Sequence, residues 1–309
     1  MNYRAKDFVQ VGWDLLFALV ADGLEQEKIL CFLRYAKVNG LWQKVDTDQA
    51  NRFLNRFYPE FLHYSEQLDA HLHAVHVDFV QRHFQPAVVL QRLMNTPTVD
   101  PVLQDLQTLC SLLQANHVPL QQMGVTGSIL VGMQKHTSDI DLVCYDRASF
   151  HQARNIIQFL ISKDLCQALN DVDWLSAYQR RACDFGLDDY IWHEQRKYNK
   201  AIFNQRKFDF SLVMSTIVKD KRPFRKLGLV RIQAEVLVDE YAFDYPALFE
   251  IKHPEISQVV CFTATYSGQA RQGELIEVVG QLEIDDQKRQ RIVVGSNREA
   301  LGEFIRVVR

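Results

Sequence analysis

The segment Asp139-Ile140-Asp141-Leu142-Val143 constrains the fold of this chain more than any other feature of the sequence. Residues two apart in a β-strand point to the same side, so Asp139 and Asp141 are predicted to project together while Ile140 and Leu142 point into a core. Like charges side by side destabilise a sheet, unless a cation balances them or they lie at an exposed edge. Carboxylate oxygens are the ligands that Mg²⁺ and Mn²⁺ prefer. The segment therefore predicts a strand that carries a divalent metal site, with an exposed edge as the alternative.

A Gly-Ser pair precedes this strand by ten residues. We expect a strand over residues 119–125 to lead into Gly127-Ser128, after which a short helix begins over residues 129–133. Glycine lets a backbone approach phosphate oxygens closely, and the N–H groups and hydroxyl of such a turn suit anions. The pair is therefore predicted to hold phosphates. Lys135 and His136, in the polar loop that follows, either contact the same anion or face solvent.

A third carboxylate comes later in the chain. Residues 207–213 alternate as a strand, with Asp209 on the side opposite the apolar residues. Lys207 shares the side of Asp209, which makes it the best placed cation for a phosphate group. The alternative for Asp209 is an ordinary exposed strand aspartate.

These residues together resemble a known family. Gly127-Ser128, a spacer of about ten residues, Asp139-Ile140-Asp141-Leu142 and the later Asp209 are similar to the pattern of the DNA polymerase beta-like nucleotidyltransferase superfamily. The whole chain is also similar to predicted nucleotidyltransferases common in archaea. That second likeness includes the glycine-rich segment around Gly268-Gln269-Ala270, and it names no acceptor.

The resemblance implies an enzyme that moves a nucleoside monophosphate from a nucleoside triphosphate to an acceptor hydroxyl by a two-metal mechanism. It implies that Asp139, Asp141 and Asp209 are the catalytic metal ligands. The triphosphate would be held by Gly127, Ser128 and Lys207. Two alternatives stay open: a catalytically silent nucleic-acid-binding or regulatory protein on the same fold, and a transferase that acts on a protein or a small molecule.

The order of patterns along the chain predicts an α+β protein of three domains. Residues 1–95 read as a small α+β domain that is mostly strands, with a helix over 47–57 and a second near 77–84. Residues 96–222 would form the central polymerase beta-like domain, a mixed sheet with helices. Residues 223–309 hold several short strands separated by glycines, which is typical of a β-rich barrel or sandwich.

The composition is that of an ordinary globular protein: 47% hydrophobic, 24% charged and a net charge of -3 over 309 residues. The apolar run over residues 11–21 is interrupted by Asp14 and is too short to span a bilayer. It also lacks the features of a secretory signal. No CxxC pair is present, and the histidines of His71-Leu-His73-Ala-Val-His76 match no closed zinc site. We expect a cytoplasmic protein with no membrane partner.

Charge is distributed unevenly along the chain. From Arg196 to Arg231 there are eleven lysines and arginines against two aspartates. Such a segment is either a solvated face or a surface for phosphates or nucleic acid. It makes RNA a candidate acceptor. The cations are Arg196, Lys197, Lys200, Arg206, Lys207, Lys219, Lys221, Arg222, Arg225, Lys226 and Arg231.

Overall fold

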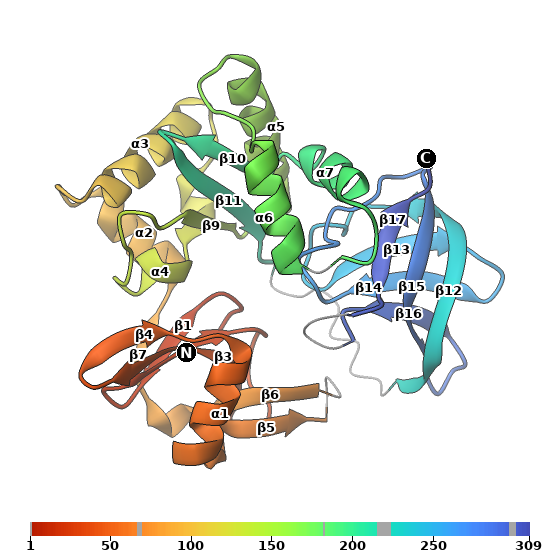
Figure 1. Cartoon of the computed structure of the whole chain (residues 1–309), viewed down its shortest axis with the longest axis horizontal. Coiled ribbons are helices and arrows are strands. Elements are labelled where there is room, and N and C mark those ends of the chain that lie inside the picture. The colour runs from red at the N-terminus through yellow and green to blue at the C-terminus, as the bar shows by residue number, and fades with distance from the viewer. Residues whose placement is uncertain (1, 67–69, 182, 215–223, 297–300) are drawn as a thin grey trace. The chain divides into compact units, whose positions relative to one another are not determined.

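The computed structural model describes residues 2–66, 70–181, 183–214, 224–296 and 301–309 (Figure 1). The chain divides into two compact units, one formed by Met1–Ser149 with Phe208–Thr216 and the other by Phe150–Lys207 with Ile217–Arg309. The structure contains α-helices and three β-sheets, so the mixed α+β class predicted from the sequence is confirmed. Among the described residues, no helix is both long and apolar enough to cross a membrane.

The first sheet lies in the N-terminal part of the first unit, in the order β5-β6-β3-β2-β1-β7, with β4 paired to β3. The helix α1 (Thr47–Phe57) covers one face, and Leu54 packs there among Phe17, Leu33 and other buried side chains. Asp46 caps this helix through a capping box with Gln49. The strands are β1 (Phe8–Val11), β2 (Leu15–Leu19), β3 (Lys28–Val38), β4 (Leu41–Lys44), β5 (Leu62–Ser65), β6 (Ala70–His76) and β7 (Val80–Phe84).

The helix predicted near residues 77–84 is wrong. Val77–Phe79 is one turn of 3-10 helix, and Val80–Phe84 is the strand β7. This strand pairs antiparallel with β1 and sets Phe84 opposite Phe8. Val80 and Phe84 are four residues apart and would share a face in either a helix or a strand, so the pairing with β1 decides between the two. The open edge of β1 supplies the hydrogen-bond partners.

Two helices precede the second sheet. They are α2 (Pro86–Met94) and α3 (Pro101–Ala115), separated by a short irregular stretch that contains Pro97. Asp100 caps α3 by accepting a hydrogen bond from the backbone of Val102. Helix α2 lies directly against the next strand: a Cβ added at Gly124 would come within 2.6 Å of the Pro86 Cβ. Glycine is needed there to let helix and strand approach.

The second sheet has four strands in the order β10-β11-β9-β8. Strand β9 runs parallel to β11 and antiparallel to β8, so the sheet is mixed. Its strands are β8 (Met123–Val125), β9 (Ile140–Cys144), β10 (Lys200–Phe203) and β11 (Arg206–Leu212). The helices between them are the short α4 (Gly127–Leu130), α5 (Arg147–Ser162), α6 (Asp171–Arg181) and α7 (Leu187–Gln195).

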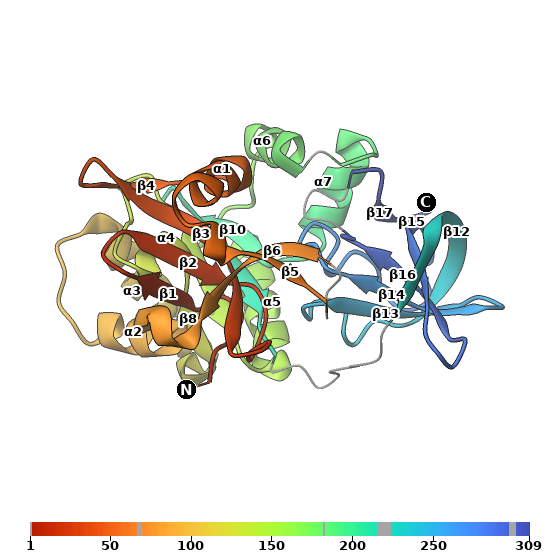
Figure 2. The same cartoon turned by 90° about the horizontal axis from the view of Figure 1, so that it is seen from below.

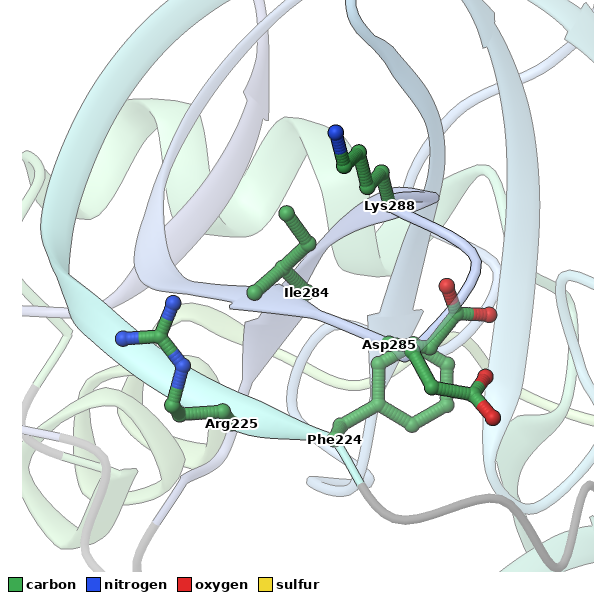
Figure 3. Close-up of a pocket in the computed structure, with 6 residues that line it drawn as sticks. Phe224, Arg225, Ile284, Asp285 and Lys288 are labelled. Atoms are coloured by element: carbon green, nitrogen blue, oxygen red, sulfur yellow. The ribbon is translucent and has the colours of Figure 1, made fainter.

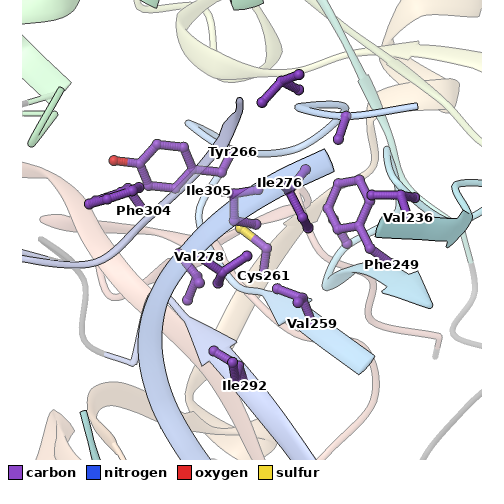
Figure 4. Packing of buried hydrophobic residues seen from close by; sticks show 14 of the residues in the cluster. Val236, Phe249, Val259, Cys261, Tyr266, Ile276, Val278, Ile292, Phe304 and Ile305 are labelled. Carbon is purple, nitrogen blue, oxygen red and sulfur yellow. The ribbon is translucent and has the colours of Figure 1, made fainter. Parts of the chain in front are cut away.

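The C-terminal strands close into a barrel. The order β12-β13-β14-β16-β15 returns to β12 through an additional β12–β15 pairing, and β17 adds to β15. Side chains such as Val236, Phe249, Val259 and Ile292 fill its centre (Figure 4). Of the two predicted alternatives, the barrel is confirmed. Its strands are β12 (Arg225–Val238), β13 (Ala247–Lys252), β14 (Ile256–Cys261), β15 (Leu275–Ile284), β16 (Gln290–Val294) and β17 (Phe304–Val307).

The predicted domain boundaries and the compact units divide the chain differently. Each predicted segment, 1–95, 96–222 and 223–309, carries one of the three sheets. The two units, however, split the middle segment, because β9 packs with the N-terminal part of the chain while most of α5, together with α6 and α7, groups with the barrel. The three-domain division stays a prediction.

Candidate active site

Asp141 and Asp209 lie side by side on neighbouring parallel strands. The register of β9 and β11 sets Asp209 directly opposite Asp141, Phe208 opposite Ile140 and Phe210 opposite Leu142. The apolar partners are buried, while both aspartates are half-buried. Alternation along two paired strands has therefore gathered two carboxylates on one side of the sheet, about 5 Å apart at the backbone.

Asp139 stands apart from this pair. Strand β9 begins at Ile140, so Asp139 lies in the preceding loop and is exposed. The strand that was predicted to include Asp139 thus begins one residue later. The charge of Asp139 still acts on Asp141, because it is one of the groups that raise the pKa of Asp141.

The surroundings of Asp141 disfavour its ionised form. Burial, and then the charge of Asp209, raise the pKa of Asp141 to about 7, whereas the ammonium groups of Lys6 and Lys44 act in the opposite direction. A cation placed between the carboxylates would relieve this repulsion, so their chemistry fits a divalent metal.

The carboxylate pair does not form a complete metal site by itself. Within the described ranges, no group of three or more histidine, cysteine, aspartate or glutamate side chains is gathered closely enough to hold a metal ion. Mg²⁺ is commonly bound by one or two carboxylates together with substrate phosphates and water. The residues present fit that mode, in which the substrate supplies the missing ligands.

The Gly127 turn lies directly against the Asp141 carboxylate. Gly127 has a φ of +66°, and a Cβ added to it would come within 2.1 Å of Asp141 Oδ2. The backbone N–H of Thr126 donates to the backbone oxygen of Asp141 at 2.9 Å. Ser128 is half-buried in the first turn of α4. The structure thus brings Gly127 and Asp141 together, as the sequence pattern implied for a phosphate turn beside a metal site.

The N-terminal sheet reaches the same place, which sequence reasoning missed. The Thr126 hydroxyl donates to the backbone oxygen of Lys6 at 2.7 Å. Ala5 packs with Val143 and Val213, at the ends of β9 and β11. Figures 1 and 2 both show this sheet beside α4. No local signal could have revealed these contacts, because the partners are more than a hundred residues apart.

Lys207 lies on β11 but its ammonium is engaged elsewhere. It forms an ion pair with Asp173 of α6 at 2.5 Å. The phosphate-binding role predicted for Lys207 would require this pair to open. In the loop before β9, the backbone N–H of Lys135 donates to the Ser138 hydroxyl at 2.9 Å, and the backbone N–H of Ser138 donates to the backbone oxygen of Lys135 at 2.8 Å. His136, in the same loop, is exposed.

Five of the eight described cations of the basic segment, Lys207 among them, form ion pairs with acids outside it. Arg196 pairs with Glu274, Lys197 and Lys200 with Glu194, and Arg231 with Glu277. Among the described residues, part of the positive charge of this segment is therefore balanced by nearby acids. Lys219, Lys221 and Arg222 lie outside the described residues.

Two histidines of the N-terminal sheet, His73 and His83, have polar partners in the structure. His73 accepts a hydrogen bond from the backbone N–H of Leu33 at Nδ1, and its Nε2 lies 2.8 Å from the Asn51 side-chain oxygen. His83 lies 2.7 Å from the Asp7 carboxylate. Both histidines are thus part of the hydrogen bonding of the N-terminal sheet.

A pocket at one end of the barrel contains none of the predicted site residues (Figure 3). Phe224 in its wall stacks against the Arg291 guanidinium at 3.4 Å, and Asp285 is held by Arg289. The pocket is lined by Phe224, Arg225, Ile284, Asp285, Asp286 and Lys288.

Comparisons with known proteins identify one relative, whose activity is not known. No protein-family model matches the chain, and no solved structure matches it. The uncharacterized protein MJ1086 of Methanocaldococcus jannaschii is 31% identical to it, in an alignment that covers the full length of both proteins. On this likeness from end to end, the chain belongs to the same family as that archaeal protein.

Proposed function

We propose that this protein is a Mg²⁺-dependent nucleotidyltransferase of the polymerase beta-like type. It would move a nucleoside monophosphate from a nucleoside triphosphate to an acceptor hydroxyl. The observation that carries the proposal is the direct pairing of Asp141 with Asp209, with the Gly127 backbone packed against Asp141. A repulsive carboxylate pair beside a glycine turn is unfavourable for the free protein, and it suits a bound metal with its phosphates.

Each residue has a role that follows from its position. Asp141 and Asp209 would hold the metal ion, and Asp139, in the loop beside them, would complete the site by turning inward. The backbone of Gly127 and the hydroxyl of Ser128 would orient the phosphates. Asp209 would also accept the proton of the attacking hydroxyl. The metal, when bound, supplies charge stabilisation for the transferring phosphoryl group.

The basic segment makes RNA the first acceptor to examine, ahead of a protein or a small molecule. The ion pairs of Arg196, Lys197 and Arg231 weigh against a surface built from those cations. Arg225 and Lys226 at the start of β12 are both exposed, and they are the described cations through which RNA binding is best tested.

The test is transfer of label from α-labelled nucleoside triphosphates in the presence of Mg²⁺, with total RNA or cell extract as the acceptor source. We expect label on an acceptor and release of pyrophosphate. Asp141→Asn and Asp209→Asn keep the side-chain shape but lose the charge, and each should reduce transfer by at least about a hundredfold. Asp78→Asn is the matched control, because Asp78 is 83% exposed in the same unit.

Two outcomes would contradict the proposal. If Asp141→Asn transfers label at the wild-type rate, the carboxylate pair is not the catalytic site. If the wild-type protein binds Mg²⁺ with nucleotide but transfers nothing to any acceptor, the protein is a silent binding or regulatory member of the same fold.

A further inference from the structure

Thr126 joins the N-terminal sheet to the carboxylate site through two hydrogen bonds. Its backbone N–H donates to the backbone oxygen of Asp141 at 2.9 Å, and its hydroxyl donates to the backbone oxygen of Lys6 at 2.7 Å. Thr126 is buried, with 7% of its surface exposed, so both bonds are shielded from water. The backbone of Lys6 is thereby held against Thr126, the residue that precedes Gly127.

The packing next to this tether holds the two parts of the site in one body. Ala5 is buried against Val143 and Val213, which follow Asp141 and Asp209 along their strands. The Arg4 guanidinium lies over the Tyr145 ring at 5.3 Å. Residues 4–6 are therefore part of the wall around the carboxylates and belong to the same compact unit.

A second lysine reaches this site from β4. In the register of β3 and β4, Lys44 is directly opposite Tyr35, and residues paired in this way share one face of the sheet. Tyr35 is buried, and the charge of Asp141 contributes to raising its pKa, after the larger effect of burial. Tyr35 and Lys44 thus lie on one face of the sheet, and the charge of Asp141 acts on that face.

Both lysines are available for a ligand. Lys6 and Lys44 are exposed, and neither forms an ion pair in the part of the chain that the structure describes. Their charges act on Asp141, since both oppose the rise of its pKa. Most described cations of the basic segment, in contrast, are paired with glutamates or with Asp173.

We propose that Lys6 and Lys44 form an anion-binding wall beside the Gly127 turn and hold the polyphosphate chain of the substrate. The proposal rests on the function proposed above, and adds that the N-terminal sheet is part of the substrate site. A triphosphate with its metal would meet the carboxylates on one side and two ammonium groups on the other. Lysine binds phosphate in this manner as a compact point charge.

The experiment separates anion binding from catalysis by using inorganic tripolyphosphate with Mg²⁺ as the probe. Binding is measured by titration calorimetry for the wild type and for Lys6→Gln, Lys44→Gln and the double variant. We expect each single variant to bind about tenfold more weakly and the double variant to bind more weakly still. Lys6→Arg and Lys44→Arg should retain most of the affinity. Circular dichroism verifies that every variant is folded.

Lys28→Gln is the matched control. Lys28 lies at the far end of β3 from Tyr35, opposite His76, so its loss should leave tripolyphosphate binding unchanged. Affinity in the wild type should also fall with added salt more steeply than in the double variant, because the lysines supply the charge. A purely structural role of the lysines would leave this salt dependence unaltered.

The outcomes distinguish this proposal from the proposed function. If the double variant binds tripolyphosphate as tightly as the wild type does, or if the wild type does not bind it, the lysine wall is wrong. If binding depends on both lysines but the wild type transfers no nucleotide, the wall stands and the transferase proposal fails. If transfer occurs while the double variant binds normally, the transferase stands without the wall.

Discussion

At the scale of single residues, Gly127 is a position that does not tolerate a side chain. Its φ of +66° disfavours any side chain, and an added Cβ would overlap the Asp141 carboxylate. We expect Gly127→Ala to lower the free energy of unfolding by about 1–3 kcal/mol. Binding of Mg²⁺ with ATP should fall at least tenfold, because the turn and the carboxylate must separate. Thermal unfolding and titration calorimetry measure the two effects.

Gly132 provides the matched control for this prediction. It has a similar φ of +71°, but nothing lies within 4 Å of a Cβ added there. Gly132→Ala should therefore show the backbone strain, roughly 1 kcal/mol, without loss of nucleotide binding. Equal loss of binding in the two variants would mean that the contact between Gly127 and Asp141 is unimportant.

The raised pKa of Asp141 predicts an unusual dependence of stability on pH in the absence of divalent cations. Between about pH 4 and 7 the folded protein keeps a proton that the unfolded chain has lost. This contribution to stability is complete at low pH and is lost as the pH rises toward 7. Asp141→Asn should therefore be more stable than the wild type above pH 7, on the order of 2 kcal/mol, and similar to it at pH 4.

Thermal unfolding with a chelator, followed by circular dichroism at pH 4 and pH 7.5, tests this prediction. Addition of Mg²⁺ should stabilise the wild type at pH 7.5 and have little effect on the variant. An Asp141→Asn protein that is less stable than the wild type at pH 7.5 would contradict the assignment.

At the scale of elements, His193 joins α7 to β17. Its Nδ1 lies 2.6 Å from the backbone oxygen of Asp189, and Nε2 accepts from the backbone N–H of Val307 at 3.0 Å. Only the neutral ring makes both bonds, and burial lowers the pKa of His193 to about 4. The unfolded chain takes up a proton first as the pH falls, so this contribution to stability is lost from about pH 6.5 down to 4.

We expect His193→Gln to be less stable than the wild type at pH 7 by about 2–3 kcal/mol and to approach it at pH 5. Denaturant unfolding followed by tryptophan fluorescence at the two pH values measures the difference. A gap of equal size at pH 7 and pH 5 would show that protonation of His193 is not involved.

The sequence predicted those elements whose pattern is local. Helix α1 has the predicted limits, because the cap at Asp46 and the apolar residues of its buried face lie within a few positions of one another. The short strands β13 and β17 were not predicted, since each becomes a strand only by pairing with β14 or β15. In β7, pairing with β1 decided against a helix.

The candidate site, too, has features that the sequence predicted and features that it could not predict. Alternation indicated that Asp141 and Asp209 face away from their apolar neighbours, and the spacing marked Gly127. The partnership of Lys6, Thr126 and Asp141 could not be predicted, because it joins residues that only the tertiary fold brings together. The pairing of Lys207 with Asp173 has the same cause.

At the scale of the whole molecule, charge is the property that decides between acceptors. The chain has a net charge of -3. In the basic segment from Arg196 to Arg231, several cations are paired with acids from other segments. If RNA is the acceptor, its affinity should fall steeply with salt, with a log–log slope of about -0.7 per neutralised phosphate. The double replacement Arg225→Gln with Lys226→Gln should flatten that slope, as measured by filter binding at several salt concentrations.

Lys252→Gln is the control for this replacement, since Lys252 is 74% exposed on another strand of the barrel. An absence of salt-dependent RNA binding in the wild type would make a protein or a small molecule the leading acceptor. The cations of the segment would then serve mainly the ion pairs described above.

The pairing of β9 with β11 also bears on how the protein is synthesised. A nascent chain that ends after α5 already contains Gly127 and Asp141, but β9 then has only β8 as a neighbour. Its other edge offers unpaired backbone groups until residues 206–212 leave the ribosome. Premature termination within that interval should therefore yield a product that is inactive and prone to aggregate. The two aspartates can meet only after Asp209 has been translated.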